Sequence, residues 1–453
     1  LHVGHGRGAA YGSALADLLE AAGHDVQREY YVNDAGRQMH ILAASVWLRY
    51  LEIIGVQVDF PSNGYQGDYV YDIARELVDL HAEGLRADAK AVTNDLPLDE
   101  PRGGDKERHI DGLIERAQLL LGETNYRTIF DCALINILKG IEVDLADFGV
   151  TFQRWYSERS LVESGQVEKC IGRLVDAGFV YDQGGAQWFK STDFGDEKDR
   201  VVIRDNGQGT YFASDIAYHL DKLGRGFDQA INVWGADHHG YIARVKGSLS
   251  AAGEDPDRLV VQLVQFANLL EDGEKVSMTP RGGQFVTLRE LYSQVGRDAA
   301  RFFYTMRKND QHLDFDLELA TRQSKDNPVF YVQYAHARIC SMLQRAQEQG
   351  FVVPSADVGT DLGVLRERHE HGLMTELSRF PEVVESAAED LSPHEIAQYL
   401  RDLATALHSW YDSHKAIVDD EGLRNARLTL ADATRVVLAN GLTLLGVTAP
   451  ESM

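Results

Sequence analysis

The sequence predicts an α/β fold with a parallel sheet, followed by an all-helical region. Small and apolar residues recur at helical spacing from Gly8 to Ala22, and a strand-like segment runs from Asp25 to Val32. The strand signal resumes at residues 229–234 and nearly vanishes after about Gln323. A helix that feeds a strand, with further strands along the chain, is typical of an α/β nucleotide-binding sheet.

A largely helical insertion is expected between these strand signals. Helical patterns dominate from about Gly36 to Leu138, broken by turn-rich and acidic stretches. We place the insertion at about residues 37–145 and expect an acidic surface. The α/β domain is expected to cover residues 1–322. It should also contain short strands separated by Gly- and Asp-rich turns, at 178–181, 187–190 and 200–204.

Residues 323–453 are predicted to form a separate helical domain. The second of its helices should bend or break at Pro381. Ser392 to Glu395 has the form of a capping box with proline at the first helical position. The amphipathic runs that predict the helices are 331–349, 372–388, 394–418 and 431–445.

Composition argues against several classes of protein. The net charge is −25, with 45 Lys and Arg against 70 Asp and Glu, so indiscriminate nucleic-acid binding is not expected. No apolar run reaches 18 residues, and a cytosolic protein is expected. Cys132, Cys170 and Cys340 form no CxxC pair, so we expect neither a disulfide framework nor a structural zinc site. Because Leu1 is not a methionine and helix signals begin at once, residues upstream are expected to be missing.

The first residues have the features of a phosphate-binding turn. The word His2-Val-Gly-His-Gly-Arg-Gly8 stands where a helix is predicted to begin. Glycines allow the backbone to approach a ligand, a helix N-terminus offers N–H groups to phosphate, and imidazoles three residues apart share a helix face. The pattern is short, however, and a glycine-rich turn with incidental histidines is the simpler interpretation when it stands alone.

Two further segments favour a nucleotide site. Trp234 to Gly240 follows a predicted strand, where ligands gather in open α/β sheets, and Asp237 there could accept from ribose hydroxyls. A metal site is the alternative, but we expect none because adjacent residues on an extended chain point apart. Glu274 to Gly283 is a polar loop with two cations that could close over pyrophosphate. A solvated surface loop is the alternative for that segment.

These segments resemble the two signatures of class I aminoacyl-tRNA synthetases. His2 to His5 resembles the HIGH signature, and Ser277 to Arg281 resembles a degenerate KMSKS signature. Other words, in the same order from residue 1 to Met453, are similar to bacterial arginyl-tRNA synthetases: Tyr30–Gly36, Gly64–Tyr69, Tyr156–Leu161, Gly235–Gly240 and Gln333–Arg338.

The resemblance implies a Rossmann-like catalytic domain, an all-α anticodon-binding domain and an arginine-tRNA ligase reaction. A monomer would activate arginine with ATP and Mg²⁺ and pass it to the 3′ end of tRNA(Arg). The resemblance places catalysis on His2, His5, Lys275, Met278 and Arg281. It places ATP contacts on His2, Gly4, His5, Gly235, Asp237, His238, His239, Val276, Ser277 and Met278.

The sequence also departs from the class pattern. Pro280 stands where the class signature has its second lysine, and the upstream lysine that substitutes for it in many arginine enzymes is not in this sequence. A non-catalytic tRNA-binding relative is therefore an alternative, against which the retained His2, His5, Tyr211 and Asp215 argue. A ligase for cysteine or another amino acid is a third possibility, which predicts a zinc-thiolate or neutral pocket.

Charge argues for the place where arginine would bind. A guanidinium is a permanent cation with five donors, so its pocket should present carboxylates and an aromatic oxygen or face. Tyr211 and Asp215 lie one turn apart at a predicted helix start, and Glu158 would add a second carboxylate; the resemblance points to the same three positions. The plain alternative is a helix N-terminal pair, with Asp215 at the positive end of the dipole. Asn33 and Asp34 end a predicted strand and either border the pocket or form an ordinary turn.

The helical region carries a candidate RNA platform. Tyr331 and Tyr334 are three residues apart, beside His336 and Arg338, and could stack on unpaired bases; core packing is the alternative. The resemblance favours tRNA contact by Tyr331, Tyr334 and Arg338 and extends it to Met453. The basic run 296–308 could grip RNA backbone or simply face solvent. Asp193 to Gly195, which is similar to a kinase metal motif, is expected to be a turn.

Overall fold

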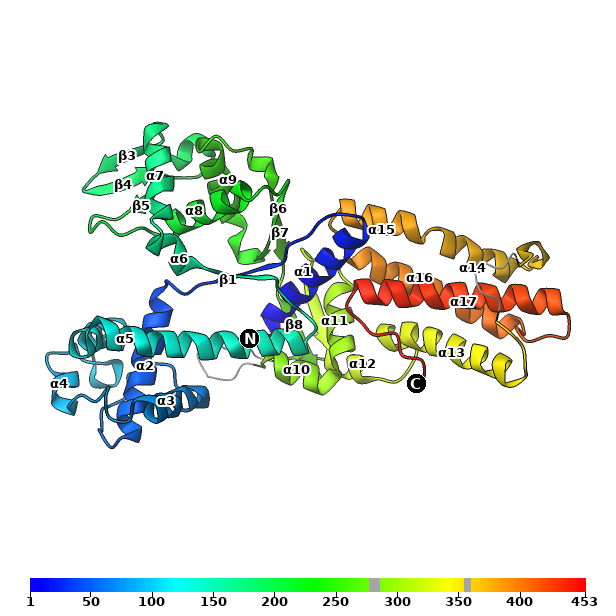
Figure 1. Cartoon of the computed structure of the whole chain (residues 1–453), viewed down its shortest axis with the longest axis horizontal. Coiled ribbons are helices and arrows are strands. Elements are labelled where there is room, and N and C mark those ends of the chain that lie inside the picture. Colours follow the sequence, from blue (N-terminus) through cyan, green and yellow to red (C-terminus); the bar gives the residue numbers. More distant parts are fainter. Residues whose placement is uncertain (277–285, 354–359) are drawn as a thin grey trace. The chain divides into compact units, whose positions relative to one another are not determined.

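The computed structural model describes residues 1–276, 286–353 and 360–453. The chain divides into two compact units. One unit contains residues 29–143 and 155–169, and the other contains residues 1–28, 144–154 and 170–453. Figure 1 labels their helices and strands.

The first unit is mainly helical, which confirms the helical character predicted for the insertion. Its core surrounds Trp47, which is 1% exposed and donates its indole N–H to the carbonyl of Leu85 at 2.9 Å. Helix α5 is kinked at Gly122, where φ is 69°. The helices are α2 (Arg37–Ile53), α3 (Asp68–His81), α4 (Ala89–Thr93), α5 (Lys106–Asp147) and α6 (Glu158–Glu163), with a short 3-10 turn at Glu100–Arg102.

The strand expected from Asp25 is shorter than predicted. β1 (Glu29–Val32) pairs with β2 (Arg154–Ser157) in a two-stranded sheet. Residues 25–28 are not in a strand, and the Arg28 side chain there pairs with Asp17 and Glu20 of the preceding helix, at 2.8 and 3.0 Å. A hydrophobic pattern alone therefore placed the start of the strand too early.

The parallel pairing predicted for the α/β region is confirmed in the second unit. β6 (Ala230–Gly235) runs parallel to β7 (Leu259–Val264), joined through α9 (Ile242–Ala251). β8 (Ala267–Glu271) runs parallel to β10 (Leu313–Asp316) and antiparallel to β9 (Glu274–Lys275). The other helices of this part are α1 (Val3–Ala21), α7 (Gln166–Asp176), α8 (Tyr211–Gly224), α10 (Leu288–Val295), α11 (Arg297–Thr305) and α12 (Leu317–Thr321).

An antiparallel sheet fills the region where short strands were expected. It consists of β3 (Val180–Gln183), β4 (Ala186–Phe189) and β5 (Arg200–Ile203). The segment after β4 is a 3-10 turn, Ser191–Phe194, closed by Gly195 at φ 87°. This confirms that Asp193 to Gly195 is a turn, with Phe194 stacked on Phe189 at 5.6 Å.

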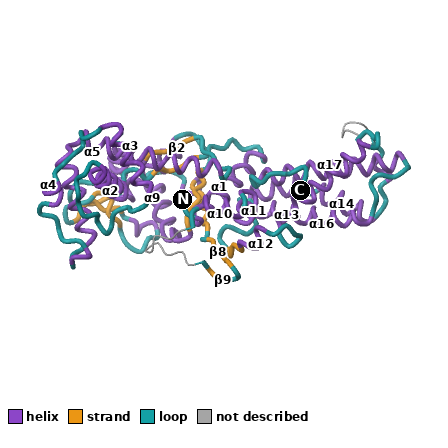
Figure 2. Tube along the Cα trace, turned by 90° about the horizontal axis from the view of Figure 1, so that it is seen from below, coloured by secondary structure: helices purple, strands orange, loops and turns teal. Residues whose placement is uncertain are grey.

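Helices that pack side by side make up the C-terminal part of the second unit (Figures 1 and 2). The predicted break near Pro381 is confirmed, because one helix ends at Ser378 and the next begins at Phe380. Glu370 is fully buried and accepts a hydrogen bond from Arg427 at 2.8 Å, which ties two of these helices together. The helices are α13 (Pro328–Glu348), α14 (Arg368–Ser378), α15 (Phe380–Glu389), α16 (His394–Ser413) and α17 (Glu421–Leu444).

The capping box predicted at Ser392 is wrong, although the helix start is right. The Ser392 hydroxyl donates to the carbonyl of Asp390 at 3.0 Å, so it does not cap the N–H of Glu395. That N–H instead bonds to the Ser392 backbone carbonyl at 3.0 Å. The same helix ends at Ser413 rather than near 418, because His414 adopts an extended conformation.

Candidate active site

The two histidines of the first motif lie together at the start of α1. The helix begins at Val3, within the word predicted to start it although before the apolar pattern at Gly8, and His2 is its N-cap. His2 Nδ1 accepts from the N–H of Gly4 at 3.0 Å, and the His2 N–H donates to His5 Nδ1 at 3.2 Å. The two ring centroids are 3.6 Å apart. A β-carbon on Gly4 would lie 2.8 Å from the His2 ring and 2.9 Å from Phe266, so a larger residue there would have to push one of these rings aside.

Burial sets the charge of these imidazoles. It lowers the pKa of His5 to about 4, with a smaller contribution from His2, and it also lowers the pKa of His2. Both rings are therefore neutral near pH 7. They can offer a phosphate neutral hydrogen-bond donors rather than positive charge.

Arg7 and Tyr304, which the sequence did not single out, hold this helix start in place. Arg7 is 1% exposed and donates to the carbonyls of Gln265, Lys308 and Gln311 at 2.7–2.9 Å. The Tyr304 hydroxyl donates to the carbonyl of Val3 at 2.8 Å. The sequence offered one indication of this role for Arg7. It is a charged residue within a run of small residues that form the buried face of α1.

The second motif forms a turn at the carboxyl end of β6. Residues Ala236–Tyr241 are a 3-10 helix in which the side chains of Asp237 and His238 are exposed and 3.8 Å apart. The segment is not extended, so the reason given for expecting no metal there was wrong. Among residues 1–276, 286–353 and 360–453, no group of three or more His, Cys, Asp or Glu side chains is arranged to hold a metal ion.

Asp215 lies in α8 beside this turn. The hydroxyl of Tyr241, the last residue of the 3-10 helix, donates a hydrogen bond to the Asp215 carboxylate. Burial raises the pKa of Asp215, while the Tyr241 hydrogen bond and the nearby charges of Lys222 and His238 act in the opposite direction. Tyr211 is half exposed at the first position of the same helix. The simple helix-dipole interpretation of Asp215 is thus incomplete, because its carboxylate has a side-chain partner.

The remaining predicted arginine-binding residues gather around the start of α6, in the first unit. Asp34 is 2% exposed and accepts from the Ser157 hydroxyl at 2.6 Å and from the N–H of Arg159 at 2.8 Å. Glu158 is buried and Asn33 is exposed. Asp34 therefore accepts a backbone N–H in the first turn of α6, whose N-cap is Ser157, and neither the pocket nor the turn interpretation is decided by this contact. A pocket that joins Asn33, Asp34 and Glu158 to Tyr211 and Asp215 stays a prediction.

The predicted pyrophosphate loop is described only at its start. Lys275 is an exposed residue of β9, reached through a tight turn in which Asp272 and Gly273 have φ of 52° and 77°. Val276 donates its N–H to the carbonyl of Leu269 at 2.9 Å. Ser277, Met278, Pro280 and Arg281 lie outside the described residues.

Three of the four predicted RNA-binding residues line one hollow of about 210 Å³: Tyr334, Arg338 and Met453. Arg338 lies 4.1 Å from the ring centre of Tyr411, a lining residue that the sequence did not indicate. Tyr331 is not in the lining; its ring lies 4.7 Å from His408. His336 is buried and bonds to the carbonyl of Pro450 at 2.8 Å, so it is not part of the platform.

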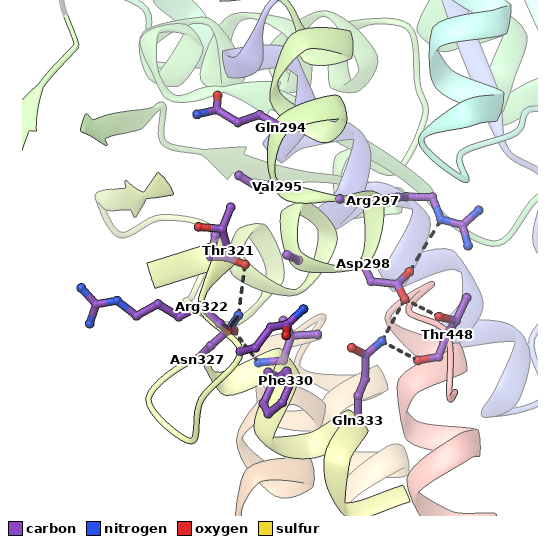
Figure 3. Close-up of a pocket in the computed structure, with 15 residues that line it drawn as sticks. Gln294, Val295, Arg297, Asp298, Thr321, Arg322, Asn327, Phe330, Gln333 and Thr448 are labelled. Atoms are coloured by element: carbon purple, nitrogen blue, oxygen red, sulfur yellow. Dashed lines mark hydrogen bonds and ion pairs between the residues drawn. The ribbon is translucent and has the colours of Figure 1, made fainter. Parts of the chain in front are cut away.

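A second hollow, of about 560 Å³, contains none of the residues predicted to bind arginine or ATP, but residues 296–299 of the basic run line it (Figure 3). Asp298 lines this hollow, and its carboxylate accepts hydrogen bonds from the Gln333 amide at 2.9 Å and from the hydroxyl of Thr448. Arg297, on the same helix, is half exposed, but Arg301 is fully buried. The basic run 296–308 is therefore not one solvent-facing stripe.

Comparison with known proteins identifies the family. Residues 1–58 and 117–322 match the family "tRNA synthetases class I (R), catalytic domain", and residues 332–453 match the "DALR anticodon binding domain". No described helix is long and apolar enough to cross a membrane.

Individual relatives agree with these matches. The chain is 59% identical over 453 residues to the arginine–tRNA ligase of Thioalkalivibrio sulfidiphilus, covering 100% of this chain and 77% of that protein. It is 55% identical to the arginine–tRNA ligase of Hydrogenovibrio crunogenus, covering 100% of this chain and 78% of that protein. A Campylobacter jejuni structure assigned as an arginyl-tRNA synthetase is 32% identical with a TM-score of 0.85, covering 100% of this chain and 91% of that one. Because the catalytic family spans more than half of the sequence and full-length identity reaches 59%, the chain belongs to the arginyl-tRNA synthetases, the class I arginine–tRNA ligases.

Proposed function

We propose that this chain binds the guanidinium of arginine at Asp215 while it carries out the ligase reaction of its family. In that reaction the arginine carboxylate attacks the α-phosphorus of ATP, the bond to pyrophosphate breaks, and arginyl-adenylate forms. A ribose hydroxyl at the tRNA 3′ end then attacks the arginyl carbonyl and releases AMP. The observation that carries the proposal is the Asp215 carboxylate, held by Tyr241 beside the Gly235–Gly240 motif at the end of β6.

The ATP residues would act mainly by positioning and charge stabilisation. His2 and His5 would donate neutral hydrogen bonds to phosphate, and Asp237 would accept from the ribose. Lys275 and the residues that follow it would neutralise pyrophosphate. Mg²⁺ would bind mainly through ATP phosphate oxygens, because it commonly uses few protein ligands and the described residues hold no ligand cluster.

Aminoacylation of tRNA(Arg) with arginine, citrulline or lysine tests the proposed substrate site. Only arginine should be transferred efficiently, because citrulline has the same shape without the charge that Asp215 would pair with. Equal use of citrulline would contradict the carboxylate pocket. Tight tRNA binding with no aminoacylation by any amino acid would support the non-catalytic relative instead.

The hollow at Tyr334 and Arg338 is proposed as an anticodon contact. Tyr334→Ala should weaken tRNA(Arg) binding by about 1–3 kcal/mol, the usual contribution of stacking a base on an aromatic ring. Filter binding or fluorescence anisotropy measures this change. Arg368→Ala is a matched control, because Arg368 is an exposed residue on α14 outside the hollow. An equal loss in both variants would refute a specific contact.

We also propose that residues 1–322 form the catalytic domain and residues 323–453 the tRNA-binding domain. Both family matches support a division in this region, since one ends at 322 and the other begins at 332. A monomer working in the cytoplasm, where tRNA and ATP are found, is the state that we expect.

A further inference from the structure

We propose that Tyr241 is a positioning residue for Asp215 and thereby determines how well the site distinguishes arginine from a neutral isostere. This inference rests on the proposed role of Asp215. Tyr241 is not among the residues that the sequence predicts to bind arginine or ATP.

The surroundings of Tyr241 fix the direction of its hydroxyl. The ring lies 6.1 Å from Phe212 and 6.0 Å from Trp234, measured between centroids, and the Arg244 guanidinium lies 4.9 Å from the ring centre. These contacts come from three elements, α8, β6 and α9. A tyrosine packed in this way presents its hydroxyl to Asp215 from a fixed position, which favours one carboxylate orientation.

Arg244, which contacts the Tyr241 ring, is itself paired with another carboxylate. Its Nε donates to Asp196 at 2.9 Å, and Asp196 also accepts two hydrogen bonds from Arg200, at 2.7 and 2.8 Å. The guanidinium of Arg244 is thus already paired with the Asp196 carboxylate. The Tyr241 ring contacts Arg244 on one side of this arrangement, and its hydroxyl donates to Asp215 on the other, so Arg244 pairs with Asp196 and Asp215 is bonded to Tyr241.

The hydrogen bond also stabilises the charged form of Asp215. Burial raises the pKa of this carboxyl, and a donated hydrogen bond from Tyr241 opposes that change by favouring the anion. The other charges that face Asp215 are Lys222 from its own helix and His238 from the 3-10 turn, and both favour the anion as well. A carboxylate has about four acceptor positions, so one tyrosine leaves room for guanidinium donors.

Loss of the Tyr241 hydroxyl should therefore weaken the site's preference for the charged guanidinium of arginine over a neutral group. A protonated Asp215 would interact with the neutral ureido group of citrulline about as well as with a guanidinium. If the Tyr241 hydroxyl is removed, the Asp215 pKa rises further, and the protonated form persists to higher pH. Arginine binding should then weaken as the pH falls, with the loss beginning at a higher pH than in the parent protein.

The test is calorimetric titration of the full chain with arginine and with citrulline between pH 5 and pH 8. For Tyr241→Phe we expect arginine affinity at pH 7 to fall about 10-fold or more, which corresponds to a hydrogen bond to a charged group. In a plot of arginine affinity against pH, the acid limb is the part where affinity falls as the pH is lowered. We expect this acid limb to move to higher pH in the variant, and citrulline affinity to change little. Tyr181→Phe is the matched control. Tyr181 lies on the separate strand β3, and its hydroxyl also donates to an aspartate, Asp199, at 2.9 Å.

Different results separate this inference from the proposal on which it rests. If Asp215→Asn abolishes arginine binding while Tyr241→Phe leaves both affinity and acid limb unchanged, the Tyr241 inference fails and the Asp215 pocket stands. If Asp215→Asn has no effect, the pocket itself fails. If Tyr241→Phe lowers the melting temperature without moving the acid limb, its role is only structural and the inference is overturned.

Discussion

Asp215→Asn should lower kcat/KM for arginine by on the order of 10²- to 10³-fold, while KM for ATP changes little. The substitution keeps the size of the side chain but removes the negative charge. It also places an amide N–H₂ against a ligand group that has only donors. Truncating one partner of a desolvated, hydrogen-bonded charge pair costs about 2–5 kcal/mol, and that loss gives the expected change in rate.

Steady-state aminoacylation with varied arginine and fixed, saturating ATP and tRNA measures this effect. Asp221→Asn is the matched control, since Asp221 is on the same helix and pairs with Arg225 at 3.4 Å. The control should behave like the parent protein. Unchanged arginine kinetics in the Asp215 variant would remove Asp215 from the pocket.

Local patterns predicted most of the helices and strands, but some element ends were placed wrongly. Pro381 marked a helix boundary because proline lacks an N–H and clashes with the preceding turn, which are local effects. Helix α17 begins at Glu421, although its apolar pattern predicted a start at 431. Its first turns follow a cap by Asp420 and contain buried Arg424 and Arg427, charged residues that a hydrophobic pattern does not count.

The candidate site shows the same division between local and distant interactions. His2 and His5 lie against each other as their three-residue spacing predicts, because the first turn of the helix sets their separation. Arg7 could not be assigned a role from the sequence, since its partners lie about residues 265 and 308–311. Tyr241 is 26 residues from Asp215, and no spacing rule connects a 3-10 turn with the preceding helix. Such contacts follow only from tertiary packing.

Arg301→Met should destabilise the protein by about 3–5 kcal/mol, the usual cost of breaking a buried polar interaction of a charged group. The Arg301 guanidinium is fully buried and donates to the carbonyls of Leu445 at 3.0 Å and Gly149 at 2.9 Å. It also donates to the Ser13 hydroxyl at 3.2 Å. Burial lowers its pKa to about 10, so it remains charged at pH 7. Methionine fills similar volume but leaves these acceptors without their donor.

Urea denaturation followed by circular dichroism, with the midpoint and slope fitted together, measures this loss. Arg297→Met is the appropriate control, because Arg297 begins the same helix but is 42% exposed and should change stability by less than about 1 kcal/mol. Arg301 connects α11 to α1, to the segment after α5 and to the end of α17, so its removal should loosen the signature helix as well as the C-terminal helices. A variant of normal stability would mean that water or rearranged side chains satisfy the carbonyls, and that the buried guanidinium is not what joins these segments.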